Sequence, residues 1–158
     1  MRGSMRHFTR RPSALLALCL GASISACGGE SLEPGVPSRG HTIAVAKCTF
    51  CHQIDGQGGM IAPPMDHCLG LVSTLVRDYE KRAADLELTY PKAYAAEAKA
   101  IEALIAEQDP QRRYEAWLAN YLRDTKFDNP MTKMGNVLLT EQQRADVIAW
   151  LMSKRPQQ

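Results

Sequence analysis

The chain has 158 residues, of which 45% are hydrophobic and 23% charged, and its formal net charge is +2. Residues 1–26 hold four of the 19 lysines and arginines and none of the 17 acidic residues, so the rest carries 15 basic against 17 acidic residues, a formal charge of −2. This balance, without a basic patch interleaved with aromatic residues, excludes a nucleic-acid-binding protein.

The first 26 residues have the features of an export signal. Four arginines precede residues 14–24, an apolar run too short to span a membrane, and small residues follow it. The sequence Ile24-Ser25-Ala26-Cys27 then resembles the bacterial lipobox, where the cysteine is lipidated and becomes the mature N-terminus. We therefore expect residues 1–26 to be a lipoprotein signal peptide. Cys27 would anchor the exported protein to a membrane, facing the periplasm or the cell exterior. A plain signal peptide cut nearby, with Cys27 free, is the alternative.

The exported part divides into a short tether and one domain. Residues 27–37 are rich in glycine, proline and serine, which predicts a flexible tether. Residues 38–158 have the size of a single domain and show helical periodicity without a strand pattern, so we expect an all-α fold. A first helix is predicted from an N-cap at Ser38 to about Cys51, with Lys47 toward its core side.

The end of this helix carries the motif C-x-x-C-H, Cys48-Thr49-Phe50-Cys51-His52. Two cysteines on one helical turn can each form a thioether with a haem vinyl group, and the adjacent histidine can then bind the iron. A zinc site needs a second ligand pair at finger-like spacing, and a thioredoxin-like motif needs a βαβ unit; the sequence offers neither. The motif predicts one covalent haem c on Cys48 and Cys51, with His52 as an iron ligand.

Glycine and proline turn signals follow the motif as far as Met65 and predict a loop around the haem edge. A histidine ligand commonly donates its second ring N–H to a backbone carbonyl, which fixes the tautomer and strengthens the metal bond. Pro63 is placed to offer that carbonyl.

The remaining helices are predicted from apolar residues that recur at helical spacing and from helix-capping residues. Residues 70–108 predict two consecutive helices, the second starting at Pro91. Asp109 and Pro110 start an amphipathic helix whose tryptophan and tyrosines are suited to the core or to the wall of a haem pocket. Thr140 opens a capping box before a last helix that runs to about Ser153.

Two methionines lie in the irregular segment before the last helix. A thioether is a suitable sixth ligand for haem iron and raises the reduction potential relative to histidine. Met131 and Met134 are both candidates, since spacing does not separate them and a methionine is more often a packing residue.

The ordered set of motifs resembles the class I cytochrome c family over residues 38–70 and 110–153. The resemblance implies an electron carrier in which Gly40 meets Trp150 where the first and last helices cross. It also implies that Met134 is the axial methionine, with Met131 as second candidate. The residues that carry the resemblance are Cys48-Thr49-Phe50-Cys51-His52, Ala62-Pro63-Pro64-Met65, Pro130-Met131-Thr132-Lys133-Met134 and Ala149-Trp150-Leu151.

Two features depart from the small members of that family. Residues 71–108 are far longer than the connection expected there, so we expect a helical insertion that docks a partner or covers the haem. Cys68 has no evident partner; pairing between chains is one outcome, and a buried, inert thiol is our expectation. His67 is a rival iron ligand or a surface residue, and His41 is expected at the surface.

Electron transfer between membrane-associated redox proteins, with one haem and no enzymatic activity, is the leading hypothesis. The alternative is a gas or redox sensor with a labile or missing sixth ligand, although a cytochrome c-prime-like bundle carries its motif near the C-terminus. A di-haem peroxidase needs a second C-x-x-C-H, and the sequence has none. The coordination number of the resting iron separates the first two hypotheses.

Overall fold

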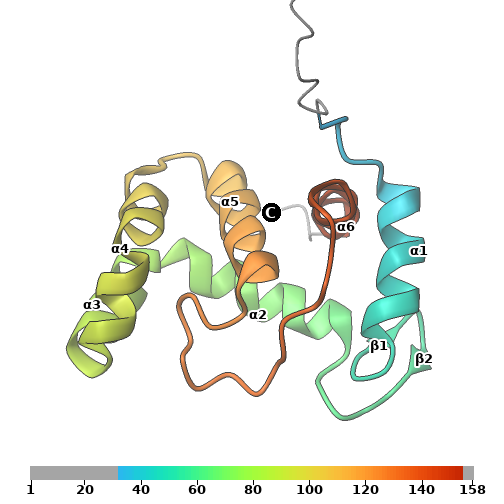
Figure 1. The fold of residues 1–158 in the computed structure, drawn as a ribbon, viewed down its shortest axis with the longest axis horizontal. Coiled ribbons are helices and arrows are strands. Elements are labelled where there is room, and N and C mark those ends of the chain that lie inside the picture. The colour runs from blue at the N-terminus through green and yellow to red at the C-terminus, as the bar shows by residue number, and fades with distance from the viewer. Residues whose placement is uncertain (1–31, 155–158) are drawn as a thin grey trace, which may run out of the picture. The chain divides into compact units, whose positions relative to one another are not determined.

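The computed structural model describes residues 32–154, so the expected signal peptide, Cys27 and the first part of the tether lie outside the described residues. The predicted all-α class is confirmed, because six helices and only one two-stranded hairpin form the described part (Figure 1). The elements are α1 Pro37–Cys48, β1 Gln53–Ile54, β2 Gln57–Gly58, α2 Met65–Arg77, α3 Tyr79–Thr89, α4 Pro91–Ala106, α5 Pro110–Arg123 and α6 Glu141–Ser153.

Helices α1 and α6 cross at a glycine. A Cβ atom on Gly40 would overlap the backbone carbonyl of Asp146 and would lie 2.9 Å from the Cβ of Trp150. The two backbones therefore approach more closely than any other residue at position 40 allows. The expected contact of Gly40 with Trp150 is present, and Figure 1 shows α6 end-on beside α1.

The chain before α1 is attached to α6, which shortens the expected tether. The backbone N–H of Glu33 donates to the Gln142 side chain at 2.9 Å, and that of Val36 donates to the Asp146 carboxylate at 2.8 Å. Helix α1 starts at Pro37 after Val36, which provides no side-chain cap, so the predicted cap at Ser38 is wrong. Proline suits a first helical turn because the N–H it lacks would have no helical partner.

One predicted position on α1 is also wrong. Lys47 is exposed, whereas the helix buries Gly40 and Ala44. The charged side chain turns to solvent because the core side of this helix is the narrow strip that crosses α6.

The region predicted as two helices contains three. Helix α2 begins at Met65, before the expected insertion, and Asp78 separates it from α3 with non-helical backbone angles (φ −102°, ψ 41°). The apolar stripe hides the break because Val76 and Tyr79 are both buried on either side of it. The Arg77 carbonyl at the end of α2 lies 3.5 Å from the Arg113 guanidinium of α5. This tertiary contact is not visible in the periodicity of α2 and α3.

The loop after the haem motif contains a small hairpin that the sequence analysis did not predict. Gln53 pairs with Gly58 and Ile54 with Gln57 in antiparallel register. Asp55 (φ 49°) and Gly56 (φ 77°) form the two-residue turn. An Asp-Gly pair is a strong signal for such a turn because both positions need a positive φ.

The predicted caps of the last two helices are confirmed. The Asp109 side chain accepts from the backbone N–H groups of Gln111 and Arg112, and Pro110 occupies the first turn of α5. Thr140 and Gln143 form both hydrogen bonds of a capping box at the start of α6.

Helix α2 runs between the ends of the domain, from the hairpin beside α1 to the pair α3 and α4 (Figure 1), and α5 packs against it. A long irregular segment, residues 124–140, joins α5 to α6. None of the helices within residues 32–154 has both the length and the apolar content that a membrane span requires.

Candidate functional site

A cavity of about 260 Å³ lies among these helices, and three of the predicted site residues, Cys48, His52 and Met134, line it. Its walls are mainly apolar and come from α1 and His52 after it, α2, α3, α5, α6 and the segment between the last two helices. The lining includes every sulfur-containing, charged and imidazole side chain of the wall and two of its aromatic ones: Cys48, His52, Met65, Cys68, Arg82, Trp117, Tyr121, Asp128 and Met134.

Backbone hydrogen bonds fix the histidine side of this cavity. Helix α1 ends at Cys48, whose carbonyl accepts from the backbone N–H groups of Cys51 at 3.1 Å and His52 at 2.9 Å. The turn places the His52 ring inside the cavity, and its Nδ1 lies 2.8 Å from the Pro63 carbonyl oxygen. The expected hydrogen bond between these residues is therefore present. It leaves Nε2 as the ring atom that can bind a metal.

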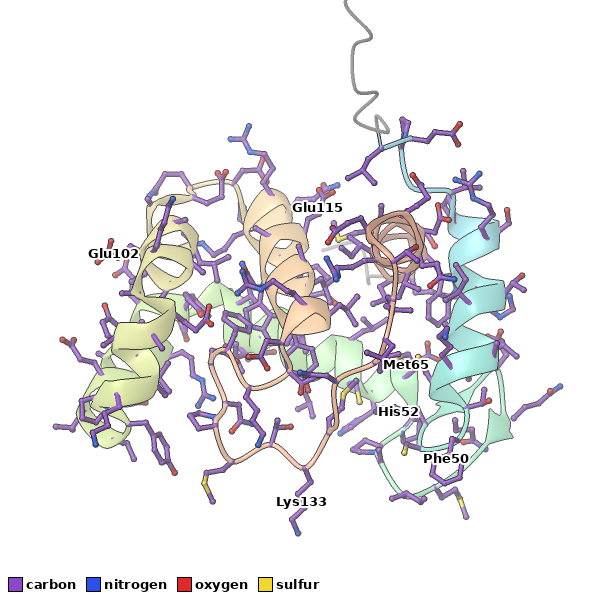
Figure 2. The ribbon with its side chains drawn as sticks, in the orientation of Figure 1. Phe50, His52, Met65, Glu102, Glu115 and Lys133 are labelled. Atoms are coloured by element: carbon purple, nitrogen blue, oxygen red, sulfur yellow. The ribbon has the colours of Figure 1, made fainter. Side chains whose placement is uncertain are left out.

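Figure 2 shows His52 and Met65 close together, where the attachment segment meets the start of α2. Met65 is half-buried, and its side chain lines the cavity on this side.

The two motif cysteines differ in their surroundings. Cys48 lines the cavity, and burial raises the pKa of its thiol, with a smaller contribution from the nearby Cys51. Cys51 is half-buried and lies outside the set of lining residues; its carbonyl accepts from Ala62 N–H at 3.0 Å. Both thiols are free, which leaves both available for thioether bonds.

Side-chain hydrogen bonds hold the part of the cavity wall around Met134, the methionine side of the cavity. Met134 lines the cavity, and its Sδ accepts a hydrogen bond from the Tyr121 hydroxyl of α5 at 3.4 Å. The buried Thr125 hydroxyl lies 2.9 Å from the Met134 carbonyl oxygen and 2.8 Å from Oδ1 of Asn136. Met131 is 68% exposed and does not line the cavity. The structure therefore separates two methionines that the sequence left as rivals.

Cys68 was expected to be buried and inert, and the structure places it in the cavity wall. Its Sγ lies 3.5 Å from the Pro63 carbonyl oxygen and 3.9 Å from Nδ1 of His52. The thiol is half-buried and forms no disulfide, and burial raises its pKa. Cys68 therefore lies against His52 and Pro63, the two residues whose hydrogen bond orients the His52 ring.

The other two histidines lie outside the cavity. His67 is exposed and does not line it, so the structure offers no support for His67 as a rival ligand. His41 is half-buried; its Nε2 lies 2.8 Å from the Asp55 carboxylate, and its ring centroid lies 5.5 Å from that of Trp150. The expected surface position of His41 is thus only partly right, because the ring covers the α1–α6 crossing.

One part of the cavity wall, formed by Arg82, Trp117 and Asp128, carries polar groups. The buried Asp128 carboxylate accepts a hydrogen bond from the Trp117 indole at 2.8 Å, and the Asp128 backbone carbonyl accepts from Nη2 of Arg82 at 2.6 Å. Burial raises the pKa of Asp128, while the Trp117 bond and the Arg82 charge oppose the rise. The sequence left Trp117 open between core and pocket wall, and it lines the cavity. The mixed charges of its helix predict a solvated face for Arg82, and this prediction is wrong because Arg82 lines the cavity. Nothing in the spacing of Asp128 or Thr125 marks them.

A comparison with protein-family models matches residues 37–155 to the cytochrome c family. Because the match spans well over half of the chain, the protein belongs to this family. No curated protein matches the chain, and no solved structure matches it. Family membership makes this a haem electron-transfer protein with covalently bound haem c.

The donor set fits that cofactor. Thiol, imidazole and thioether groups surround one apolar cavity, and these are the groups that attach haem c and bind its iron. In residues 32–154, His, Cys, Asp and Glu side chains form no group of three or more that could hold a bare metal ion. The assignment of individual residues to haem attachment and iron binding remains a prediction.

Proposed function

We propose that the protein is a mono-haem c-type cytochrome that carries electrons between membrane-associated redox partners. In this proposal Cys48 and Cys51 would attach one haem, and His52 and Met134 would bind its iron. The haem supplies an Fe(II)/Fe(III) couple. The chain supplies the apolar enclosure, the ligands and the hydrogen bonds that orient them.

One observation carries the proposal: His52 and Met134, distant in sequence, both line the same apolar cavity that Cys48 lines. Each ligand candidate makes a hydrogen bond that positions it, His52 to the Pro63 carbonyl and Met134 from the Tyr121 hydroxyl. Side chains that hydrogen bonds hold in place favour one fixed coordination geometry.

The cavity chemistry favours a carrier over an enzyme. Asp128 is the one carboxylate among the described lining residues, and it already accepts the Trp117 hydrogen bond. The thioether at Met134 would fill the coordination site that a substrate or a gas needs. Electron transfer needs neither a general base nor an open site, so the residues present suffice for it.

An exposed apolar surface beside the attachment segment supports redox protein partners. Phe50, Met60 and Ile61 are 80%, 86% and 75% exposed. They belong to the segment that holds His52, and Figure 2 shows Phe50 on the hairpin side of that segment. The Gly59 N–H donates to the Thr49 carbonyl and the Ala62 N–H to the Cys51 carbonyl, so the stretches around Phe50 and around Met60 lie side by side. Exposed apolar side chains gathered in one patch are typical of a protein-contact surface.

Export and anchoring are part of the same proposal. The arginine-rich start and the lipobox-like sequence before Cys27 support secretion, removal of residues 1–26 and lipidation of Cys27. The protein then faces the periplasm or the cell exterior. Growth with radiolabelled palmitate should label the wild type and not Cys27→Ser; equal labelling of both would overturn the anchor.

The absorption spectrum of the oxidised holoprotein tests the iron ligands. We expect the weak near-infrared band of methionine bound to ferric haem, lost in Met134→Ala and retained in Met131→Ala. Met131 is the matched control because it lies in the same segment but faces solvent. A wild type that lacks the band, is high-spin and binds carbon monoxide when reduced would replace the carrier by the sensor hypothesis.

A further inference from the structure

Arg82 of α3 has a buried donor that no described residue uses. Its side chain lines the cavity, and Nη2 is held at 2.6 Å from the Asp128 carbonyl oxygen. Its Nε is buried, yet within residues 32–154 no acceptor reaches it. Buried donors normally have partners, because losing water without gaining a hydrogen bond is unfavourable. The guanidinium of Arg82 therefore lacks one hydrogen-bond partner at the cavity wall.

The charge of this guanidinium is also unpaired. Among the ion pairs of the described residues, none involves Arg82. Asp128 is the nearest candidate, but its carboxylate accepts from the Trp117 indole, and Arg82 binds its backbone carbonyl instead. A cation in the wall of an apolar cavity favours an anionic group inside that cavity.

The position of Arg82 matches one edge of a haem. The cysteine thioethers form at the vinyl edge of the macrocycle, and the propionates extend from the opposite edge. Cys48 is at the end of α1, whereas Arg82 is on α3, and these two helices lie at opposite ends of the domain (Figure 1). A haem that is tied at Cys48 and fills the cavity directs its propionates away from α1, toward the side that Arg82 lines.

We propose that the Arg82 guanidinium binds a haem propionate through its Nε, so that the segment beyond α2 supplies the carboxylate anchor of the cofactor. This rests on the proposed function, since it requires a haem in the cavity. The contact would make α3 part of the cofactor site, whereas the sequence suggested partner docking or a cover over the haem as the role of this region. Arg82 fits because its guanidinium carries several donors: Nη2 binds the Asp128 carbonyl, and the adjacent Nε keeps an unused donor for a carboxylate.

The chain offers a matched control. Arg144 of α6 also has a buried Nε without a partner among the described residues, but it does not line the cavity. Its Nη1 pairs with Glu141 at 2.8 Å. Arg144 therefore resembles Arg82 in its buried, unpartnered Nε but, unlike Arg82, does not line the cavity. The two arginines separate a propionate contact from a general effect of losing a buried guanidinium.

The test uses holoprotein whose haem propionates carry ¹³C, introduced by growth on carboxyl-labelled 5-aminolevulinate. NMR of the reduced, diamagnetic protein follows each propionate carboxyl through a pH titration. We expect one wild-type propionate to titrate at clearly lower pH than the other. Arg82→Met should raise that one pKa because a cation and a donor are lost, Arg82→Lys should restore it in part, and Arg144→Met should leave it unchanged.

Two results would overturn the proposal. One is a wild type in which both propionates titrate as solvent-exposed carboxyls, a measurement that needs no variant to fold. The other is an Arg82→Met holoprotein with the wild-type propionate pKa values. Covalent haem is checked first by a haem stain on a denaturing gel; a chain that never acquires it overturns the proposed function, whereas stained protein with unperturbed propionates overturns only the role of Arg82.

Discussion

The two sides of the cavity are built differently. Backbone hydrogen bonds hold the histidine side: the Cys48 carbonyl accepts from Cys51 and His52, and the Cys51 carbonyl accepts from Ala62. Side chains hold the methionine side, where the Tyr121 hydroxyl meets the Met134 sulfur and the Thr125 hydroxyl meets its carbonyl. Backbone patterns follow from short motifs with glycine and proline. Side-chain networks depend on which residues the fold brings together.

The largest expected effect breaks the histidine side. Cys51 belongs to the motif but does not line the cavity, whereas Cys68 lines it and lies outside the motif. We expect Cys51→Ser to abolish or sharply reduce mature covalent haem, because one thioether is lost. Cys68→Ser should keep the full amount. A haem stain and the mass of the purified chain measure both; retention in Cys51→Ser with loss in Cys68→Ser would contradict the motif assignment.

The next effect acts on the helix that carries Cys48. Gly40→Ala places a methyl group into the Asp146 carbonyl of α6, so we expect destabilisation by about 3 kcal/mol in chemical denaturation of the holoprotein. Gly70→Ala is the control, since nothing lies within 4 Å of a Cβ there and Gly70 is exposed within α2. It should stabilise by about 0.5–1 kcal/mol. Equal stability of the two variants would contradict the close α1–α6 contact.

Thr125→Val weakens the methionine side while keeping the shape of the side chain. The change removes the buried hydroxyl that donates to the half-buried Met134 and to the exposed Asn136, whose Oδ1 still accepts from the Thr125 backbone N–H. Loss of this hydrogen bond costs about 1 kcal/mol. We expect lower stability and easier displacement of Met134 by imidazole, followed in the near-infrared band. Unchanged imidazole affinity would show that Thr125 does not hold this segment.

The smallest effect removes one hydrogen bond. Tyr121→Phe deletes the hydroxyl that donates to the Met134 sulfur at 3.4 Å and keeps the ring stacked on Trp117. In the wild type, the hydrogen bond from Tyr121 draws electron density from the Met134 sulfur. Its removal therefore favours Fe(III) and lowers the reduction potential. A contribution of about 1 kcal/mol corresponds to about 40 mV for one electron. Potentiometric titration measures the shift, and a rise in potential would contradict the assignment.

The contrast between the two sides explains which predictions hold. The C-x-x-C-H motif, the Pro63 carbonyl and the caps at Asp109 and Thr140 are local patterns. The structure contains the predicted hydrogen bond between His52 and Pro63 and both predicted helix caps. The Asp55-Gly56 turn was readable in the same way and was missed. By contrast, the break at Asp78 leaves the apolar stripe of α2 and α3 intact, so periodicity cannot locate it.

The sequence by itself determined the helical class, the haem motif and two candidate methionines, because each depends on residues within a few positions of one another. Only the tertiary structure separated Met134 from Met131, placed Cys68 against the His52–Pro63 hydrogen bond and brought Arg82 to the cavity. These outcomes depend on how α2, α3 and α5 pack around the segment before α6. Packing joins residues that are distant in the chain, and no local pattern records which ones will meet.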